Sequence, residues 1–210
     1  MPTYLEAFDG DSVAWNAFCR IVEAEGCKDF VETGTYKGGT SLTIARAFSD
    51  MAVWTIELDP DLFAQAAKRF EGLGVHNLLG DSVALLPKIL PTLRPRPFFW
   101  LDAHISPCNV AHGSQYPERY PLCDELKAIA AVKHLRPIIG IHDFLSPGHP
   151  ELSFDSDHGV PLDWNYVKAS VNLIYDDPVP HVHNELATGE PGIGRVGIVY
   201  IGVERTDGKE

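Results

Sequence analysis

Acidic side chains stand at the ends of three successive predicted strands. Glu32 and Glu57 end the first and second strands, and Asp81 follows the third. In an open α/β sheet ligands bind at this edge, and an acid after the second strand can accept hydrogen bonds from both hydroxyls of a ribose. An acid after the third strand could accept from an adenine amino group. Together the three acids predict a nucleoside pocket, although each alone could cap a helix or lie in solvent.

A glycine-rich turn joins the first strand to the next helix. It contains Gly34, Gly38 and Gly39. A ligand that packs against backbone needs residues without a Cβ, and the helix N-terminus offers free N–H groups. The glycines of this turn are spaced Gly34-x-x-x-Gly38-Gly39, unlike the dinucleotide fingerprint Gly-x-Gly-x-x-Gly, and Glu32 would repel a pyrophosphate. S-adenosylmethionine (SAM) carries a cationic amino group and a sulfonium, so this acid favours SAM over a dinucleotide.

Successive motifs of the chain resemble those of class I SAM-dependent methyltransferases. They are Glu32-Thr-Gly-Thr-Tyr-Lys-Gly-Gly-Thr-Ser41, Thr55-Ile-Glu-Leu-Asp59, Leu79-Gly-Asp-Ser82 and Phe99-Trp-Leu-Asp-Ala-His104. The match runs from about residue 28 to 144 and is most similar to small bacterial enzymes of the macrocin O-methyltransferase and cephalosporin hydroxylase group.

The resemblance implies a role for each part of the pocket. Glu32 and the turn would face the methionine portion of SAM, Glu57 the ribose, and Asp81 with Ser82 the adenine. The cofactor-binding residues that it implies are Glu32, Thr33, Gly34, Thr35, Gly38, Gly39, Thr40, Ser41, Glu57, Asp81, Ser82 and Asp102.

Acids and histidines also end the next two predicted strands. Asp102 and His104 end the fourth, and His142 and Asp143 end the fifth. The fold makes these strands neighbours, so we expect the four side chains to converge as the catalytic residues. Two carboxylates suit Mg²⁺, and imidazoles favour Mn, Fe or Zn. We expect Asp102, His142 and Asp143 to be the ligands of a divalent metal (Mg, Mn or Fe).

A metal there could hold vicinal hydroxyls of an acceptor and lower the pKa of the one that attacks the SAM methyl group. His104 or His142 would be the general base. Without a metal, Asp102 would contact SAM and His104 would belong to the core. The group that the chain resembles carries Asp-Asp or Glu-Asp after the fifth strand, where this chain has His142-Asp143. This departure leaves the metal and its identity open.

Three functions are therefore compatible with the sequence. The first is O-methylation of a small hydroxylated molecule by a SAM-dependent enzyme. The second is a metal-dependent hydroxylase of the cephalosporin hydroxylase type, and the third is a SAM- or nucleoside-binding protein without catalysis.

Strands and helices must alternate to place these side chains at one edge. Continuous apolar strands between amphipathic helices predict an α/β, Rossmann-like, doubly wound sheet of seven mostly parallel strands with helices on both faces. The last two strands form an antiparallel pair, because their connection is too short for a crossover helix. Asp59, just before Pro60, is the expected cap of the helix at 60–70, and Ser82 is the expected cap of a short helix. The expected elements are helices at 11–25, 40–48, 60–70, 122–134 and 164–174, and strands at 29–33, 52–58, 76–79, 97–101, 137–141, 181–185 and 195–203.

The chain is expected to form one domain of 210 residues. It divides into an N-terminal helical segment (1–27), the SAM-binding core (28–144) and a final loop, helix and antiparallel strand pair (145–210). We expect the substrate walls to come from the N-terminal helix and from the loops 105–120 and 145–161, since long loops in compact domains are commonly functional.

Composition limits the partners. The formal net charge of -12 disfavours nucleic acid, which needs clustered bases. No apolar run approaches the ~20 residues of a membrane span, so no membrane partner is expected. The N-terminus lacks the features of a signal peptide, which predicts a cytoplasmic protein. A small-molecule acceptor is the expected partner, and apolar strands near the C-terminus are compatible with a homodimer.

Overall fold

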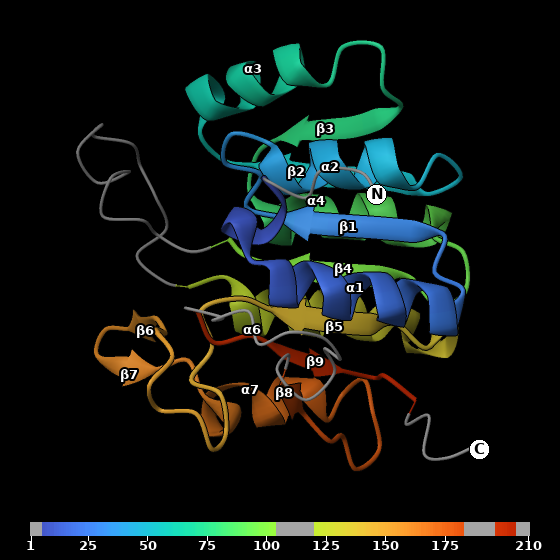
Figure 1. Cartoon of the computed structure of the whole chain (residues 1–210). Coiled ribbons are helices and arrows are strands. Elements are labelled where there is room, and N and C mark those ends of the chain that lie inside the picture. Colours follow the sequence, from blue (N-terminus) through green and yellow to red (C-terminus); the bar gives the residue numbers. More distant parts are fainter. Residues whose placement is uncertain (1–5, 104–119, 183–195, 205–210) are drawn as a thin grey trace.

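A seven-stranded sheet forms the centre of the molecule. The computed structural model describes residues 6–103, 120–182 and 196–204. Strands β1 to β5 are parallel, and β9 is antiparallel to both of its neighbours, which confirms the predicted fold class and the antiparallel C-terminal pair (Figure 1). The strand order is β3 (Val75–Leu79), β2 (Ala52–Glu57), β1 (Asp29–Thr33), β4 (Phe98–Leu101), β5 (Ile138–Ile141), β9 (Val199–Ile201) and β8 (His181–Val182).

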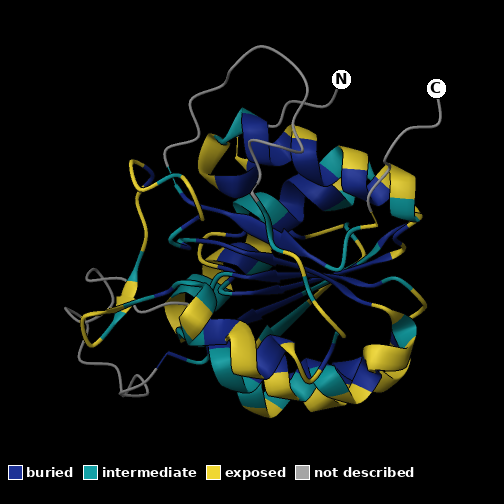
Figure 2. Ribbon diagram, turned by 90° about the horizontal axis from the view of Figure 1, so that it is seen from below, coloured by how far each residue is buried: buried dark blue, intermediate teal, exposed yellow. Residues whose placement is uncertain are grey.

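Helices cover both faces of this sheet, and the buried residues lie between the layers (Figure 2). Helices α1 (Ser12–Glu25) and α2 (Gly39–Ala47) pack on one face, and α3 (Pro60–Arg69) packs beside α2. The opposite face carries α4 (Ser82–Ile89), α6 (Leu122–Ile129) and α7 (Trp164–Val171). The remaining elements of the described residues are three 3₁₀ helices, η1 (Ala7–Gly10), η2 (Leu90–Thr92) and η3 (Ala130–Leu135), and a hairpin of β6 (Ser156–Asp157) and β7 (Val160–Pro161).

Strand β1 is covered by helices on both faces of the sheet, although Asp29, Glu32 and Thr33 are polar. All five of its residues are buried. Successive side chains of a strand point to opposite faces, so Phe30 packs against α1 and Val31 lies in the core under α4 and α6. A strand covered on both sides has no solvent face, which removes the alternation of polar and apolar residues.

Aspartates begin several of the helices. Asp11 caps α1, and Asp59 caps α3 as the sequence predicts, through hydrogen bonds to backbone N–H groups of the first turn. The prediction that Ser82 caps the next helix is wrong. The cap of α4 is Asp81, whose Oδ1 accepts from Val83 N at 3.0 Å, and Ser82 is the buried first residue of the helix. A carboxylate accepts from the helix N-terminus at least as well as a hydroxyl.

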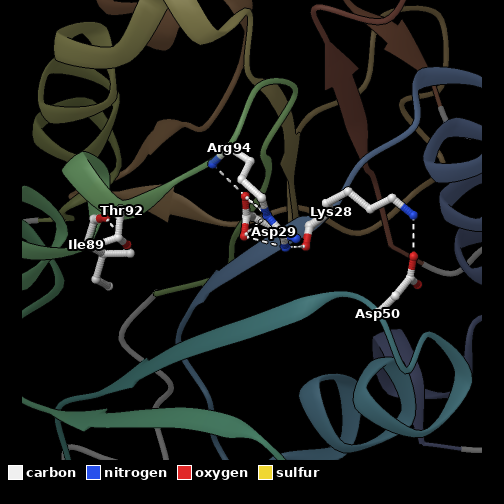
Figure 3. A network of polar contacts seen from close by, with 6 residues as sticks. All are labelled: Lys28, Asp29, Asp50, Ile89, Thr92 and Arg94. Atoms are coloured by element: carbon white, nitrogen blue, oxygen red, sulfur yellow. Dashed lines mark hydrogen bonds and ion pairs between the residues drawn. The ribbon is translucent and has the colours of Figure 1, made fainter.

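Ion pairs fix the opposite edge of the sheet, where β1 begins (Figure 3). The buried carboxylate of Asp29 accepts from the backbone N–H of Arg94 at 2.7 Å and from its guanidinium at 2.9 Å. Arg94 precedes β4, so this bidentate contact ties the starts of two neighbouring strands together. Lys28 and Asp50 form an exposed pair beside it. These charges lie at the amino ends of the strands, away from the predicted ligand edge.

The C-terminal part departs from the sequence predictions in detail. The region expected as an irregular loop at 145–161 contains the β6–β7 hairpin, and the helix expected at 122–134 divides into α6 and η3. Strand β9 is shorter than predicted and fully buried between β5 and β8. Among the described residues, no helix has both the length and the apolar character needed to cross a membrane.

Candidate functional site

At Gly34 the glycine-rich turn, the predicted cofactor site, contacts the end of β4, where the predicted catalytic residues begin. Its φ is +83°, and a Cβ at this position would lie 2.3 Å from the backbone oxygen of Asp102. Only glycine fits such a contact, because any side chain would clash and the left-handed backbone would be strained. The turn of residues 32–41, called the glycine turn below, therefore packs backbone to backbone on the end of β4.

The other two glycines of the glycine turn face the protein itself. A Cβ on Gly38 would lie 2.7 Å from the ring of Phe70, and one on Gly39 would lie 2.5 Å from the backbone oxygen of Glu6. The sequence explained these glycines by the close approach of a ligand. In the structure, the C-terminal cap of α3 and the N-terminal segment fill the space that the missing side chains leave.

Glu32 is buried beneath the glycine turn, with 2% of its surface exposed. Its Oε2 accepts hydrogen bonds from Ser41 Oγ at 2.6 Å and from Thr55 Oγ1 at 2.7 Å. Burial raises the pKa of Glu32 to about 8, although both hydroxyls oppose the shift. The carboxyl group thus joins the start of α2 to β1 and β2. These contacts are with the chain's own hydroxyls.

Glu57 holds the tip of the glycine turn. Its Oε2 accepts from Tyr36 N at 2.7 Å and its Oε1 from Asp59 N at 2.9 Å, and burial raises its pKa. The hydroxyls of Thr35 and Thr55 lie 2.5 Å apart below it. Tyr36 itself is 52% exposed with a φ of 49°. The sequence analysis did not name Tyr36 as a candidate site residue, although an aromatic residue within a glycine-rich turn stands out in the sequence.

The N-terminal segment reaches the glycine turn from a distant part of the sequence. Thr40 Oγ1 accepts from Phe8 N at 3.0 Å. Arg69 forms an ion pair with Glu6 and donates to Lys37 O at 2.7 Å. Thr40, expected to bind the cofactor, therefore already holds η1 against α2.

A buried acid that the sequence analysis missed lies on the other face of the sheet. Glu125 of α6 is 1% exposed. Burial raises its pKa to about 7, and the facing hydroxyls of Ser82 and Thr33 partly oppose the shift. The signal was visible, because Glu125 occupies the apolar helical stripe formed by Leu122, Leu126 and Ile129. A charged residue in such a stripe indicates a buried polar contact.

Three of the four residues expected at the ends of β4 and β5 come together as predicted. His142 Nδ1 lies 3.1 Å from Asp102 Oδ1 and 3.1 Å from Asp143 Oδ2. Asp102, His142 and Asp143, called the acidic rim below, each offer one ligand atom, and these atoms lie within 4.8 Å of one another. His104, the fourth residue, and the adjoining loop lie outside the described residues.

The acidic rim concentrates charge around one imidazole. Burial acts to lower the pKa of His142, but Asp102 and Asp143 overcome it and raise this pKa well above its usual value. A protonated Nδ1 would therefore donate to both carboxylates. A divalent ion could take the place of that proton, because two carboxylate oxygens and one imidazole nitrogen form a donor set for Mn or Fe. The residues present thus fit a metal.

The β6–β7 hairpin is tied to the acidic rim. Asp155 N donates to Asp143 O at 2.9 Å, and Tyr120 OH donates to Asp155 Oδ2 at 2.6 Å. Tyr166 OH, from α7, donates to Asp157 Oδ2 at 2.7 Å. The region that the sequence analysis expected as a substrate wall at 145–161 therefore lies beside the acids.

A hollow of about 670 Å³ lies elsewhere, between α1 and the segment that ends α2 and leads to β2. Trp15, Cys19, Phe48 and Met51 are among its lining residues. Its polar border includes Lys28 and Asp50, which pair with each other at the amino ends of the strands. It has no counterpart to the converging acids of the rim.

Comparison with known proteins shows the fold. No protein-family model matches the sequence, and no curated protein matches it either. The chain is similar to the SAM complex of the O-methyltransferase TomG of Streptomyces achromogenes, involved in tomaymycin synthesis, with 18% identity, a TM-score of 0.60, and 95% of this chain and 82% of that one covered. It is also similar to the SAH-bound methyltransferase PaMTH1 of Podospora anserina (15% identity, TM-score 0.53, 97% and 85% covered) and to an O-methyltransferase of Bacillus cereus in complex with SAH (16%, 0.52, 91% and 80%).

At these identities the similarity establishes the architecture of the class I SAM-dependent O-methyltransferases. It does not single out the macrocin O-methyltransferase and cephalosporin hydroxylase group within that architecture. The roles of individual residues rest on the geometry described above.

Proposed function

We propose that this protein is a SAM-dependent methyltransferase that methylates a hydroxyl group of a small molecule. The observation that carries the proposal is the contact of Gly34 with the Asp102 backbone. It puts the glycine turn, where the sequence predicts the cofactor, directly beside an acidic rim able to bind an acceptor. The neighbouring folds with bound SAM or SAH support the choice of cofactor.

Bound SAM would supply an electrophilic methyl group next to the acidic rim. Glu57 keeps lone pairs on both oxygens after accepting from two backbone N–H groups, so it can still accept from ribose hydroxyls. Asp81 accepts from Val83 through Oδ1 at the start of α4, where its carboxylate can also meet an adenine amino group. The negative charge of these acids complements the cationic cofactor.

The acidic rim would act on the acceptor. Asp102, His142 and Asp143 would hold a divalent ion that lowers the pKa of a coordinated hydroxyl. During transfer the hydroxyl oxygen bonds to the methyl carbon, the carbon–sulfur bond breaks with its electron pair left on sulfur, and the hydroxyl proton must leave. If Nδ1 of His142 holds the ion, this nitrogen cannot also accept that proton. A carboxylate of the rim or solvent would then take the proton.

Labelled SAM tests the proposal. We expect calorimetry to detect binding of SAM and of its demethylated product, and a panel of catechols, phenols and sugar diols to yield a labelled acceptor. Glu57→Gln should weaken SAM binding. Asp143→Asn should keep SAM binding and lose transfer. Absence of SAM binding by the wild-type protein would refute the proposal, and SAM binding without any transfer would favour a binding protein.

The metal has a test of its own. We expect dialysis against EDTA to stop transfer and added Mg²⁺, Mn²⁺ or Fe²⁺ to restore it. Unchanged turnover after EDTA, with no metal in elemental analysis, would remove the metal from the proposal. Consumption of oxygen and 2-oxoglutarate by the iron-loaded protein would support a hydroxylase instead.

A further inference from the structure

The indole ring of Trp100 lies directly behind the acidic rim. This residue of β4 is fully buried, and its ring centroid lies 4.4 Å from that of Phe8 and 5.5 Å from that of His142. Gly140, in the middle of β5, makes room for it, because a Cβ there would lie 2.7 Å from Trp100 Cε3. Glycine inside a strand marks such a close approach.

The polar edge of the ring meets Asp102. Trp100 Nε1 lies 3.3 Å from Asp102 Oδ2, and the other oxygen of this carboxylate faces His142 Nδ1 at 3.1 Å. A buried indole N–H requires an acceptor. The contact follows from the register of the strand, since residues two positions apart lie on the same face.

We propose that Trp100 is a positioning residue of the acidic rim. It directs Oδ2 of Asp102 toward the core, so that Oδ1 is presented to His142 and to the position where the three ligand atoms converge. The ring cannot turn away, because the side chains of Phe8 and Tyr200 pack against it and the backbone of Gly140 closes the third side. The consequence for a metal rests on the proposed function, whereas the orientation of the carboxylate does not.

The first test detects the contact between the Trp100 indole N–H group and Asp102 directly. The protein has four tryptophans, so the indole N–H signals in a ¹H–¹⁵N spectrum are few and Trp100→Phe assigns one of them. Asp102→Asn should move the Trp100 indole signal more than those of Trp15, Trp54 and Trp164. If the Trp100 signal stayed in place, or all four moved alike, the inference would be overturned.

The second test compares two variants of the same aromatic cluster. Trp100→Phe keeps an aromatic ring and removes the N–H group. Tyr200→Phe removes a hydroxyl that points to Ala14 O and does not contact Asp102. Because loss of a partner behind a metal ligand typically costs roughly tenfold or more in affinity, Trp100→Phe should weaken Mn²⁺ binding, measured by calorimetry, about tenfold. Tyr200→Phe should bind Mn²⁺ like the wild-type protein.

The outcomes separate the two proposals. Equal Mn²⁺ affinity of Trp100→Phe and wild type would overturn the positioning role alone. If the wild-type protein bound no metal, the metal role of the acidic rim would fall, and the indole signal would decide whether Trp100 positions Asp102. Should Trp100→Phe fail to fold, Trp15→Phe, Trp54→Phe and Trp164→Phe assign the Trp100 signal by exclusion. The spectra of the wild type and Asp102→Asn then still decide, because both keep Trp100.

Discussion

The glycine turn and the acidic rim lie at the same edge of the sheet, but their acids have different hydrogen-bond partners. In the first region, Glu32 and Glu57 accept hydrogen bonds from Ser41, Thr55 and backbone N–H groups of the chain itself. In the second region, two carboxylates share a single nitrogen of His142. An acid at a strand end is therefore not by itself a ligand-binding group. The hydrogen-bond donors around it decide its role.

The pKa shifts have different causes in the two regions. Burial raises the pKa of Glu32 to about 8, so this carboxyl group tends to remain neutral. In the acidic rim, burial opposes the charge on His142, and the neighbouring carboxylates prevail. In the first region the Glu32 carboxyl group thus keeps its proton inside the fold. In the second region charged groups are gathered at a place where a cation or an acceptor could bind. Substitutions can separate these two roles.

A substitution at the contact between the two regions should give the largest loss of stability. Gly34→Ala places a Cβ against the backbone of Asp102 and strains a left-handed residue, so we expect a loss of at least about 3 kcal/mol in the free energy of unfolding. Urea denaturation measures it. Gly72→Ala is the matched control, because Gly72 has a similar φ of +77° with nothing within 4 Å of a Cβ. An equal loss in both variants would assign the whole effect to backbone strain.

Removal of a rim charge should abolish chemistry and leave the fold intact. Asp143→Asn is expected to lower methyl transfer at least about 100-fold, because a coordinating or proton-accepting carboxylate is lost. Its melting temperature should stay close to that of the wild-type protein. Asp176→Asn, an exposed acid after α7, should keep full activity. A fully active Asp143→Asn would show that the rim is not the reactive part of the molecule.

Glu32 should affect the pH dependence of stability. Its folded-state pKa of about 8 exceeds the usual 4.5, so its contribution to stability is fully present below the lower value and is lost as pH rises through the higher one. The slope between them is about 1.4 kcal/mol per pH unit. Glu32→Gln should flatten this part of the profile in urea denaturation. The exposed Glu71→Gln should not, and an unchanged slope in Glu32→Gln would place the proton elsewhere.

The smallest effect is expected where the N-terminal segment meets the glycine turn. Thr40→Val removes the acceptor for Phe8 N and should cost about 1 kcal/mol of stability. Amide exchange of Phe8 should become faster, and Mn²⁺ binding at the acidic rim should not change. Ser49→Ala, an exposed position after α2, serves as the control. A weaker metal site in Thr40→Val would mean that the two regions are coupled through the N-terminal segment.

Local sequence patterns determined the fold and much of the candidate site. The alternation of apolar strands and helices predicts the sheet, and Asp59 followed by Pro60 predicts the start of α3. Neighbouring strands bring their ends together, so the meeting of Asp102, His142 and Asp143 could be predicted without coordinates. These features depend on residues close in sequence or on the order of strands.

Only the tertiary structure decided which partner each group has. Phe70 and Glu6 fill the space beside Gly38 and Gly39, where the sequence suggested a ligand. Glu125 lies buried beside Ser82 and Thr33, and Trp100 meets Asp102 in a space that Gly140 provides. Such contacts join residues far apart in the chain, and they depend on packing between layers. A sequence pattern gives the type of each side chain, whereas its donors, burial and pKa depend on the neighbours that folding brings.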